Sequence, residues 1–178
     1  TKPSNGLGHL LGTTDAAGGV YDELAYTIGP AATGALAGNA TQADVADMVA
    51  GGFSVFAEGT ATKDGEAFDF AWGFTATTRY APCETTARVD GDTGTAQITI
   101  HADHLFYDSL VSGSPDVRFQ LVADADANDD GEVTLDELAA VDITSLPNYQ
   151  VGNMTNVTNL RLFIAAQIGT LGHVDGEG

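Results

Sequence analysis

Residues 68–74 read Phe-Asp-Phe-Ala-Trp-Gly-Phe, so an aromatic side chain stands at every second position. Successive side chains of a β-strand point to opposite faces of the sheet, and this spacing therefore places the aromatic side chains on one face. Aromatic side chains bury large apolar areas, which is typical of a sheet face that covers a core. We predict a strand over residues 68–74 that forms a principal slab of the core.

The segments around this strand predict a further set of short strands. Residues 63–66 read Lys-Asp-Gly-Glu, a hairpin turn pattern that joins residues 68–74 to a preceding strand over 53–62. Residues 20–28 alternate between apolar and polar side chains, and residues 88–100 predict a second hairpin. Short strands with Gly-rich breaks are typical of an antiparallel sandwich. We therefore expect a mainly β, α+β protein built on an antiparallel β-sandwich.

Helical patterns are confined to a few segments, most of them in the last third of the chain. They are a short helix that begins at Thr41 with a capping box at Asp44 and ends at Gly51-Gly52, and residues 117–123, 135–141 and 156–171. We expect an irregular N-terminal arm over residues 1–19 and a single domain over residues 20–178. Segment 117–141 is expected to be an insertion with a helix on each side of an acidic loop.

The amino-acid composition, above all the net charge, limits which molecules the protein can bind. The chain has 178 residues, enough for one domain, and its 25 acidic against 6 basic residues give a formal net charge of −19. This charge excludes a broad surface for nucleic acid or for an anionic membrane, because both need basic groups. No apolar run is long enough to span a bilayer. A polar, acidic surface of this kind suits an extracytoplasmic environment, and cations are its natural partners.

The acidic loop matches a known pattern for binding a divalent cation. Residues 126–137 read Asp-Ala-Asn-Asp-Asp-Gly-Glu-Val-Thr-Leu-Asp-Glu, which fits the twelve-residue EF-hand loop at each diagnostic position. The residues at ligand positions are Asp126, Asn128, Asp130, Glu132 through its backbone carbonyl, Thr134 and Glu137. Gly131 takes the sharp turn and Val133 points to the core. We predict Ca²⁺ rather than Mg²⁺, because the loop supplies many oxygen ligands in an elongated cage.

The sequence predicts a structural role for this ion. Seven of the 25 acidic residues lie between 124 and 137, so they repel one another without a cation and the local fold is expected to depend on metal. Sensor EF-hands usually work in pairs and expose a Met-rich groove, whereas this chain has one such loop and two Met.

The histidines suggest a second kind of metal site. His101 and His104 stand three positions apart, and on a turn or a first helical turn they can meet and share Cu or Zn. His173 follows the last predicted helix and is placed to be a third ligand, while His9 lies in the Gly-rich arm. The alternative is that each histidine is a hydrogen-bonding residue of a loop or of the core.

No pattern in the sequence predicts catalysis. We find no Cys–His or Ser–His–Asp arrangement for a nucleophile and no carboxylate pair spaced for acid–base work. No Gly-rich loop follows a predicted strand in the way that phosphate-binding loops do. We therefore expect that the protein is not an enzyme.

Three stretches together resemble a known group of proteins. They are residues 99–108 (Thr-Ile-His-Ala-Asp-His-Leu-Phe-Tyr-Asp), residues 70–74 with Cys83 after them, and residues 171–178 (Leu-Gly-His-Val-Asp-Gly-Glu-Gly). They resemble a set of uncharacterised, secreted bacterial lipoproteins that is distantly similar to the periplasmic and surface copper-binding proteins associated with methanobactin systems. The resemblance covers about residues 50–178. The EF-hand loop is not part of the copper-protein pattern.

The resemblance implies an exported β-sandwich with a metal site at His101, His104 and His173. It also implies a lipid anchor outside the given sequence, and a cysteine beyond Gly178 as the partner of Cys83. The whole reading predicts a secreted, periplasmic or outer-surface metal-binding protein, with structural Ca²⁺ in the loop and copper or zinc at the histidines for capture or storage. The alternative is a calcium-stabilised adhesion or carbohydrate-binding module with a protein or glycan partner, in which the histidines are structural.

Overall fold

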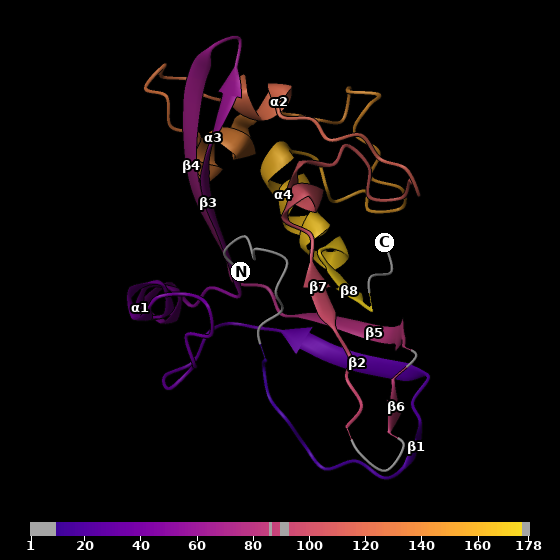
Figure 1. Cartoon of the computed structure of the whole chain (residues 1–178). Helices are drawn as coiled ribbons and strands as arrows, with labels where there is room; N and C mark the ends of the chain where they lie inside the picture. Colours follow the sequence, from indigo (N-terminus) through magenta and orange to yellow (C-terminus); the bar gives the residue numbers. More distant parts are fainter. Residues whose placement is uncertain (1–9, 86, 90–92, 176–178) are drawn as a thin grey trace. The chain divides into compact units, whose positions relative to one another are not determined.

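The structure is a computed structural model that describes residues 10–85, 87–89 and 93–175 (Figure 1). The chain divides into two compact units. The first unit contains residues 1–55, 75–101 and 172–178, and the second contains residues 56–74 and 102–171. The elements, with η for 3₁₀ helices, are β1 (Gly19–Val20), β2 (Glu23–Ile28), α1 (Gln42–Gly51), β3 (Val55–Lys63), β4 (Glu66–Phe74), β5 (Thr78–Glu84), β6 (Arg88–Val89), β7 (Ile98–Ile100), η1 (Ala102–Phe106), α2 (Gln120–Ala123), α3 (Leu135–Ala140), α4 (Leu160–Gln167), η2 (Ile168–Thr170) and β8 (Gly172–Val174).

The fold class is mixed α+β, as the sequence predicts at the coarse level. Within the described ranges the strands pair as β1–β6, β2–β5, β3–β4 and β7–β8. The β1–β6, β2–β5 and β7–β8 pairs are antiparallel, and β3–β4 is a hairpin. A closed sandwich is not shown among these pairs, so the predicted sandwich is not confirmed. None of the described helices is long and apolar enough to cross a bilayer.

The hairpin predicted over residues 88–100 is wrong. Its first arm, β6, pairs with β1, where Gly19 stands opposite Val89. Its second arm, β7, pairs with β8, where Ile98 stands opposite Val174. Both arms therefore find partners far away in the sequence, and these pairings override the local turn pattern between them. Residues 90–92 of the expected turn lie outside the described residues.

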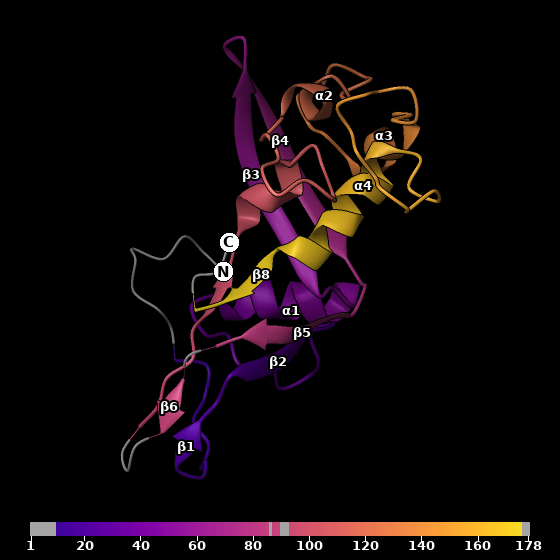
Figure 2. The same cartoon turned by 90° about the vertical axis from the view of Figure 1, so that its right-hand side faces the viewer.

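The centre of the first unit is a pair of stacked tyrosines on β2 and β5. Tyr26 stands opposite Tyr80, and their ring centroids are 4.7 Å apart at an interplanar angle of 13°. Gly172 of β8 lies so close to this pair that a Cβ atom there would collide with the Tyr26 hydroxyl, which explains the glycine. Figure 2 shows β8 next to β5. Burial, followed by the charges of Tyr80 and Cys83, raises the pKa of Tyr26 to about 12.

The short helix α1 forms as its sequence predicts. Thr41 is the N-cap, its hydroxyl accepts the Asp44 amide at 3.1 Å, and the Asp44 carboxylate accepts the Thr41 amide at 2.7 Å. These reciprocal bonds satisfy two amides that the helix itself leaves without acceptors. Gly52 ends the helix in the left-handed region, with φ of 62°.

The β3–β4 hairpin carries the aromatic slab of the second unit. Asp64 and Gly65 both have positive φ, 54° and 91°, which is the geometry of a two-residue hairpin turn. Trp72 is fully buried on β4, and the Phe70 ring stacks against it with centroids 4.5 Å apart. The predicted role in the core is therefore confirmed for Trp72 and Phe74, whereas Phe68 and Phe70 are half-buried. Gly59 of β3 leaves room for the Phe70 ring, because a Cβ atom there would lie 3.0 Å from it.

The late helices are shorter than the sequence predicts, although α3 falls short of its predicted range 135–141 by a single residue. The expected helix over residues 156–171 begins only at Leu160, because the Asn159 side chain accepts the Leu162 amide at 2.9 Å and caps it, and it continues into η2. Within the expected helix 117–123 only Gln120–Ala123 is helical, since Val117 pairs with Tyr107 in an isolated bridge. Helix α4 buries Leu160, Phe163 and Ile164, which together with the buried Ile168 of η2 form one apolar stripe.

Candidate metal centres

The first half of the 126–137 loop is folded around its acidic side chains. The Asp126 carboxylate accepts the Gly131 amide at 2.9 Å and the Asp130 amide at 3.3 Å. The Asn128 side-chain oxygen accepts the same Asp130 amide at 3.2 Å. Asp129 and Gly131 have φ of 56° and 79°, so the loop reverses direction at these two positions. The side-chain oxygens of the predicted ligands Asp126 and Asn128 therefore both accept the Asp130 amide.

The third predicted ligand completes this group. The Asp130 carboxylate accepts the Glu132 amide at 2.9 Å with one oxygen and the Asn128 side-chain amide at 2.9 Å with the other. The Glu132 side chain itself is exposed, which agrees with a predicted role through its backbone carbonyl. Oxygen-rich side chains therefore gather on one side of a tight turn, which is the chemistry that a hard cation prefers.

Glu137 links the end of the loop to its beginning. One of its oxygens accepts the Thr134 amide at 2.9 Å and the Thr134 hydroxyl at 2.8 Å, and the other accepts the Ala127 amide at 3.1 Å. The Thr134 hydroxyl in turn accepts the Glu137 amide, so this pair is the capping box of α3. The hydrogen bonds from Thr134 and Ala127 outweigh burial and hold the pKa of Glu137 below its usual value. The side chain is therefore a carboxylate at neutral pH.

The opposite side of the loop faces the core of the second unit. Val133 is 1% exposed, as its position in the pattern predicts, and its backbone carbonyl accepts the indole N–H of Trp72 at 2.8 Å. Leu138 of α3 is fully buried. The loop therefore has one polar side and one anchored side, an arrangement that holds the ligand positions on a packed scaffold.

Two of the four histidines, with an aspartate, form a second cluster in one four-residue stretch. His101, Asp103 and His104 each offer one ligand-type atom, and these atoms lie within 4.8 Å of one another. His104 is buried, and its Nδ1 lies 2.6 Å from the Thr170 carbonyl oxygen. With the proton on Nδ1 the ring donates to that carbonyl and presents Nε2 as its lone-pair nitrogen, an orientation common among metal-binding histidines.

The third predicted histidine contacts the first. His173 lies on β8 opposite Thr99, and its ring meets the His101 ring edge to face with centroids 4.9 Å apart. Asp103, which accepts the Tyr107 hydroxyl at 3.1 Å, is a candidate ligand that the sequence analysis did not single out. Asp103 lies between the two histidines in the sequence His-Ala-Asp-His, and this position is the sequence feature that indicates it as a ligand. His9 lies outside the described residues.

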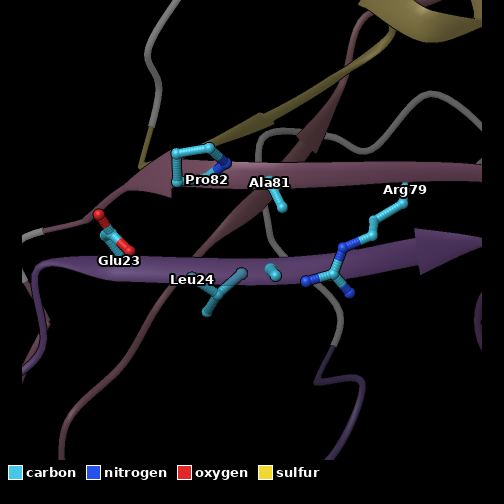
Figure 3. Close-up of a pocket in the computed structure, with 6 residues that line it drawn as sticks. Glu23, Leu24, Arg79, Ala81 and Pro82 are labelled. Carbon is cyan, nitrogen blue, oxygen red and sulfur yellow. The ribbon is translucent and has the colours of Figure 1, made fainter.

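A shallow depression lies on the β2–β5 pair of the first unit. It is lined by Glu23, Leu24, Ala25, Arg79, Ala81 and Pro82. Figure 3 shows Glu23 and Arg79 at opposite ends of it, with aliphatic side chains between them. The two charged groups do not converge on one point, so the depression contains no arrangement that we can assign to a ligand.

Comparison with known proteins leaves the two clusters to be interpreted from their own chemistry. No family model matches the chain, and no curated protein or solved structure matches it significantly.

Proposed function

We propose that the protein binds metal ions and that its 126–137 loop takes one Ca²⁺ as a structural ion. The observation that carries this proposal is the closed hydrogen-bonded loop, in which Asp126 receives the Gly131 amide and Glu137 returns to the Ala127 amide. The side chains at the predicted ligand positions are oxygen donors, and the loop contains no Lys or Arg. A divalent cation offsets the mutual repulsion of these carboxylates.

The first test is a calcium titration by isothermal calorimetry on chelator-treated protein. We expect one site per chain in the unsubstituted protein. Glu137→Gln removes one ligand charge and is expected to weaken binding by at least about 10-fold, because ligand charge sets the affinity of such loops over several orders of magnitude.

Asp136→Asn is the matched control, since it removes the same charge from the neighbouring residue. The Asp136 side chain is 96% exposed and pairs only with Arg161 among the ion pairs found in the described chain. Equal calcium affinities for the Glu137 and Asp136 variants would show that the loop is only a solvated acidic segment.

We further propose a transition-metal site at His101 and His104, with Asp103 as an added ligand and His173 as the neighbour of His101. The support is the approach of ligand-type atoms within 4.8 Å in one stretch of chain. Two imidazoles and a carboxylate are a ligand set suited to Zn²⁺ or Cu²⁺. Such a site fits capture or storage of copper or zinc.

A zinc titration tests this second site. We expect His101→Ala to weaken Zn²⁺ binding by about 10-fold or more, since it removes one of few protein ligands. The calcium titration of the same variant is the control and is expected to stay unchanged. Unaltered affinity for both Zn²⁺ and Cu²⁺ in His101→Ala and in His173→Ala would refute the histidine site.

The place of action is proposed to be outside the cytoplasm, at the cell surface or in the periplasm. The support is the net charge of −19 carried by few charged residues, 17% of the chain, which suits an exported acidic protein. The resemblance to secreted lipoproteins points the same way. We also propose that the strands pack into the β-sandwich that the sequence predicts.

A further inference from the structure

The calcium loop is paired through its backbone with the β3–β4 hairpin. The Asp69 amide donates to the Gly131 carbonyl at 2.7 Å, and the Val133 amide donates to the Asp69 carbonyl at 2.8 Å. Asp69 and Glu132 accordingly form a parallel bridge, and β4 has β3 on one edge and the loop on the other (Figure 1). The hydrogen-bonding edge of the loop is therefore used within the chain.

A side-chain bond reinforces this backbone pairing. The indole N–H of Trp72, also on β4, donates to the Val133 carbonyl at 2.8 Å, and both side chains are buried. Near the hairpin tip, Lys63 forms an ion pair with Asp124, two residues before the loop. The hairpin thus contacts the loop and its entrance from β3 and from β4.

The residues that make this pairing lie among the predicted ligands. Gly131, whose carbonyl accepts the Asp69 amide, gives its own amide to Asp126. Glu132, which forms the bridge, is the residue whose carbonyl is expected to bind the ion. Only one or two peptide groups separate the Asp126 and Asp130 carboxylates from the hydrogen bonds to β4. Movement of these carboxylates is therefore expected to move the groups that bind β4.

We propose that the β3–β4 hairpin is the regulatory partner of the loop: calcium binding holds the hairpin against residues 131–133, and loss of calcium releases it. This proposal rests on the proposed calcium site. Without the ion, repulsion between Asp126 and Asp130 favours an open loop, which breaks the alignment of the three bonds to β4. By linkage, the hairpin also raises the affinity of the loop for calcium.

Trp72 provides a direct reporter, because it is the one tryptophan of the chain. Its indole bond ends on the loop and its ring stacks on Phe70, so its emission reports the pairing of hairpin and loop. Trp72→Phe keeps an aromatic ring and removes the donor. Phe74→Leu changes another buried aromatic side chain of β4, 7% exposed, and is the matched control.

The experiment measures amide hydrogen exchange of the whole protein with calcium and with a chelator, next to a calcium titration by calorimetry. We expect calcium to slow exchange of the Asp69 and Val133 amides by at least about 10-fold. The emission of Trp72 should shift at the same calcium concentration. Trp72→Phe should bind calcium about 3- to 10-fold more weakly than Phe74→Leu.

The outcomes separate this proposal from the one it rests on. Calcium binding by calorimetry with unchanged exchange at Asp69 and Val133 would overturn the coupling and leave the calcium site intact. Absence of any calcium binding would overturn both. Calcium-dependent exchange at both amides, which needs at least about 10-fold more calcium in Glu137→Gln but not in Asp136→Asn, would establish the coupling even if Trp72→Phe folds poorly.

Discussion

Removal of calcium is expected to lower the melting temperature of the protein by roughly 5–10 °C. A ligand present at 100 times its dissociation constant stabilises the folded state by about 2.7 kcal/mol, provided that the unfolded chain does not bind it. For a chain of this size, each 1 kcal/mol shifts the melting temperature by about 2–4 °C. The measurement is a calorimetric scan in calcium-containing buffer and in buffer with a calcium chelator.

The physical reason lies in the structure of the loop. Asp126, Asp130 and Glu137 are held close by hydrogen bonds to the backbone, and the unfolded chain relieves their repulsion by moving them apart. Calcium offsets the repulsion between these carboxylates only when the loop is folded, so it stabilises the folded state. At the same calcium concentration, a 10-fold loss of affinity in Glu137→Gln should therefore reduce the shift to about half, whereas Asp136→Asn should keep it. Identical melting temperatures with and without the chelator in the unsubstituted protein would contradict the proposal.

The parts of the fold that the sequence predicts well are those decided by neighbouring residues. The Thr41 capping box and the Asp64-Gly65 turn each lie within four positions of the chain. Their hydrogen bonds form between groups that the local backbone already brings together, so the pattern is sufficient. The turns at the centre of the loop follow the same rule, since Gly131 stands where a positive φ is needed.

The parts that the sequence does not predict depend on distant segments. Strand β6 pairs with β1, and strand β7 pairs with β8. The paired residues, such as Val89 and Gly19 or Ile98 and Val174, are about 70 positions apart in the sequence. No period or turn pattern in residues 88–100 contains that information. The bridge between Asp69 and Glu132 likewise joins residues far apart in the sequence, so no local pattern predicts it.

The two candidate metal sites also differ in how far local sequence predicts them. The calcium loop is a contiguous motif, and all its candidate residues were found from spacing. In the histidine cluster, Asp103 and His104 belong to the 3₁₀ helix η1 and His101 directly precedes it. Spacing alone left open whether the pair faces one side, because a strand would have placed the two rings on opposite faces.

Phe163→Ala is expected to destabilise the protein by about 3–5 kcal/mol, the usual cost of truncating a buried aromatic side chain. Phe163 is fully buried on α4, and the Tyr149 ring packs edge-on against it with centroids 5.1 Å apart. Its removal leaves a cavity in the packed second unit, which cannot collapse without moving α4. Urea unfolding followed by Trp72 fluorescence measures the loss.

Leu162→Ala is the control, since Leu162 is the preceding residue on α4 and its side chain is 40% exposed. Its truncation should cost less than about 1 kcal/mol. Helix α3 packs on α4 and carries Glu137 in its first turn, so a shift of α4 also displaces a calcium ligand. Phe163→Ala is therefore expected to bind calcium more weakly than Leu162→Ala. Equal unfolding free energies for the two variants would mean that α4 does not anchor the core beneath the loop.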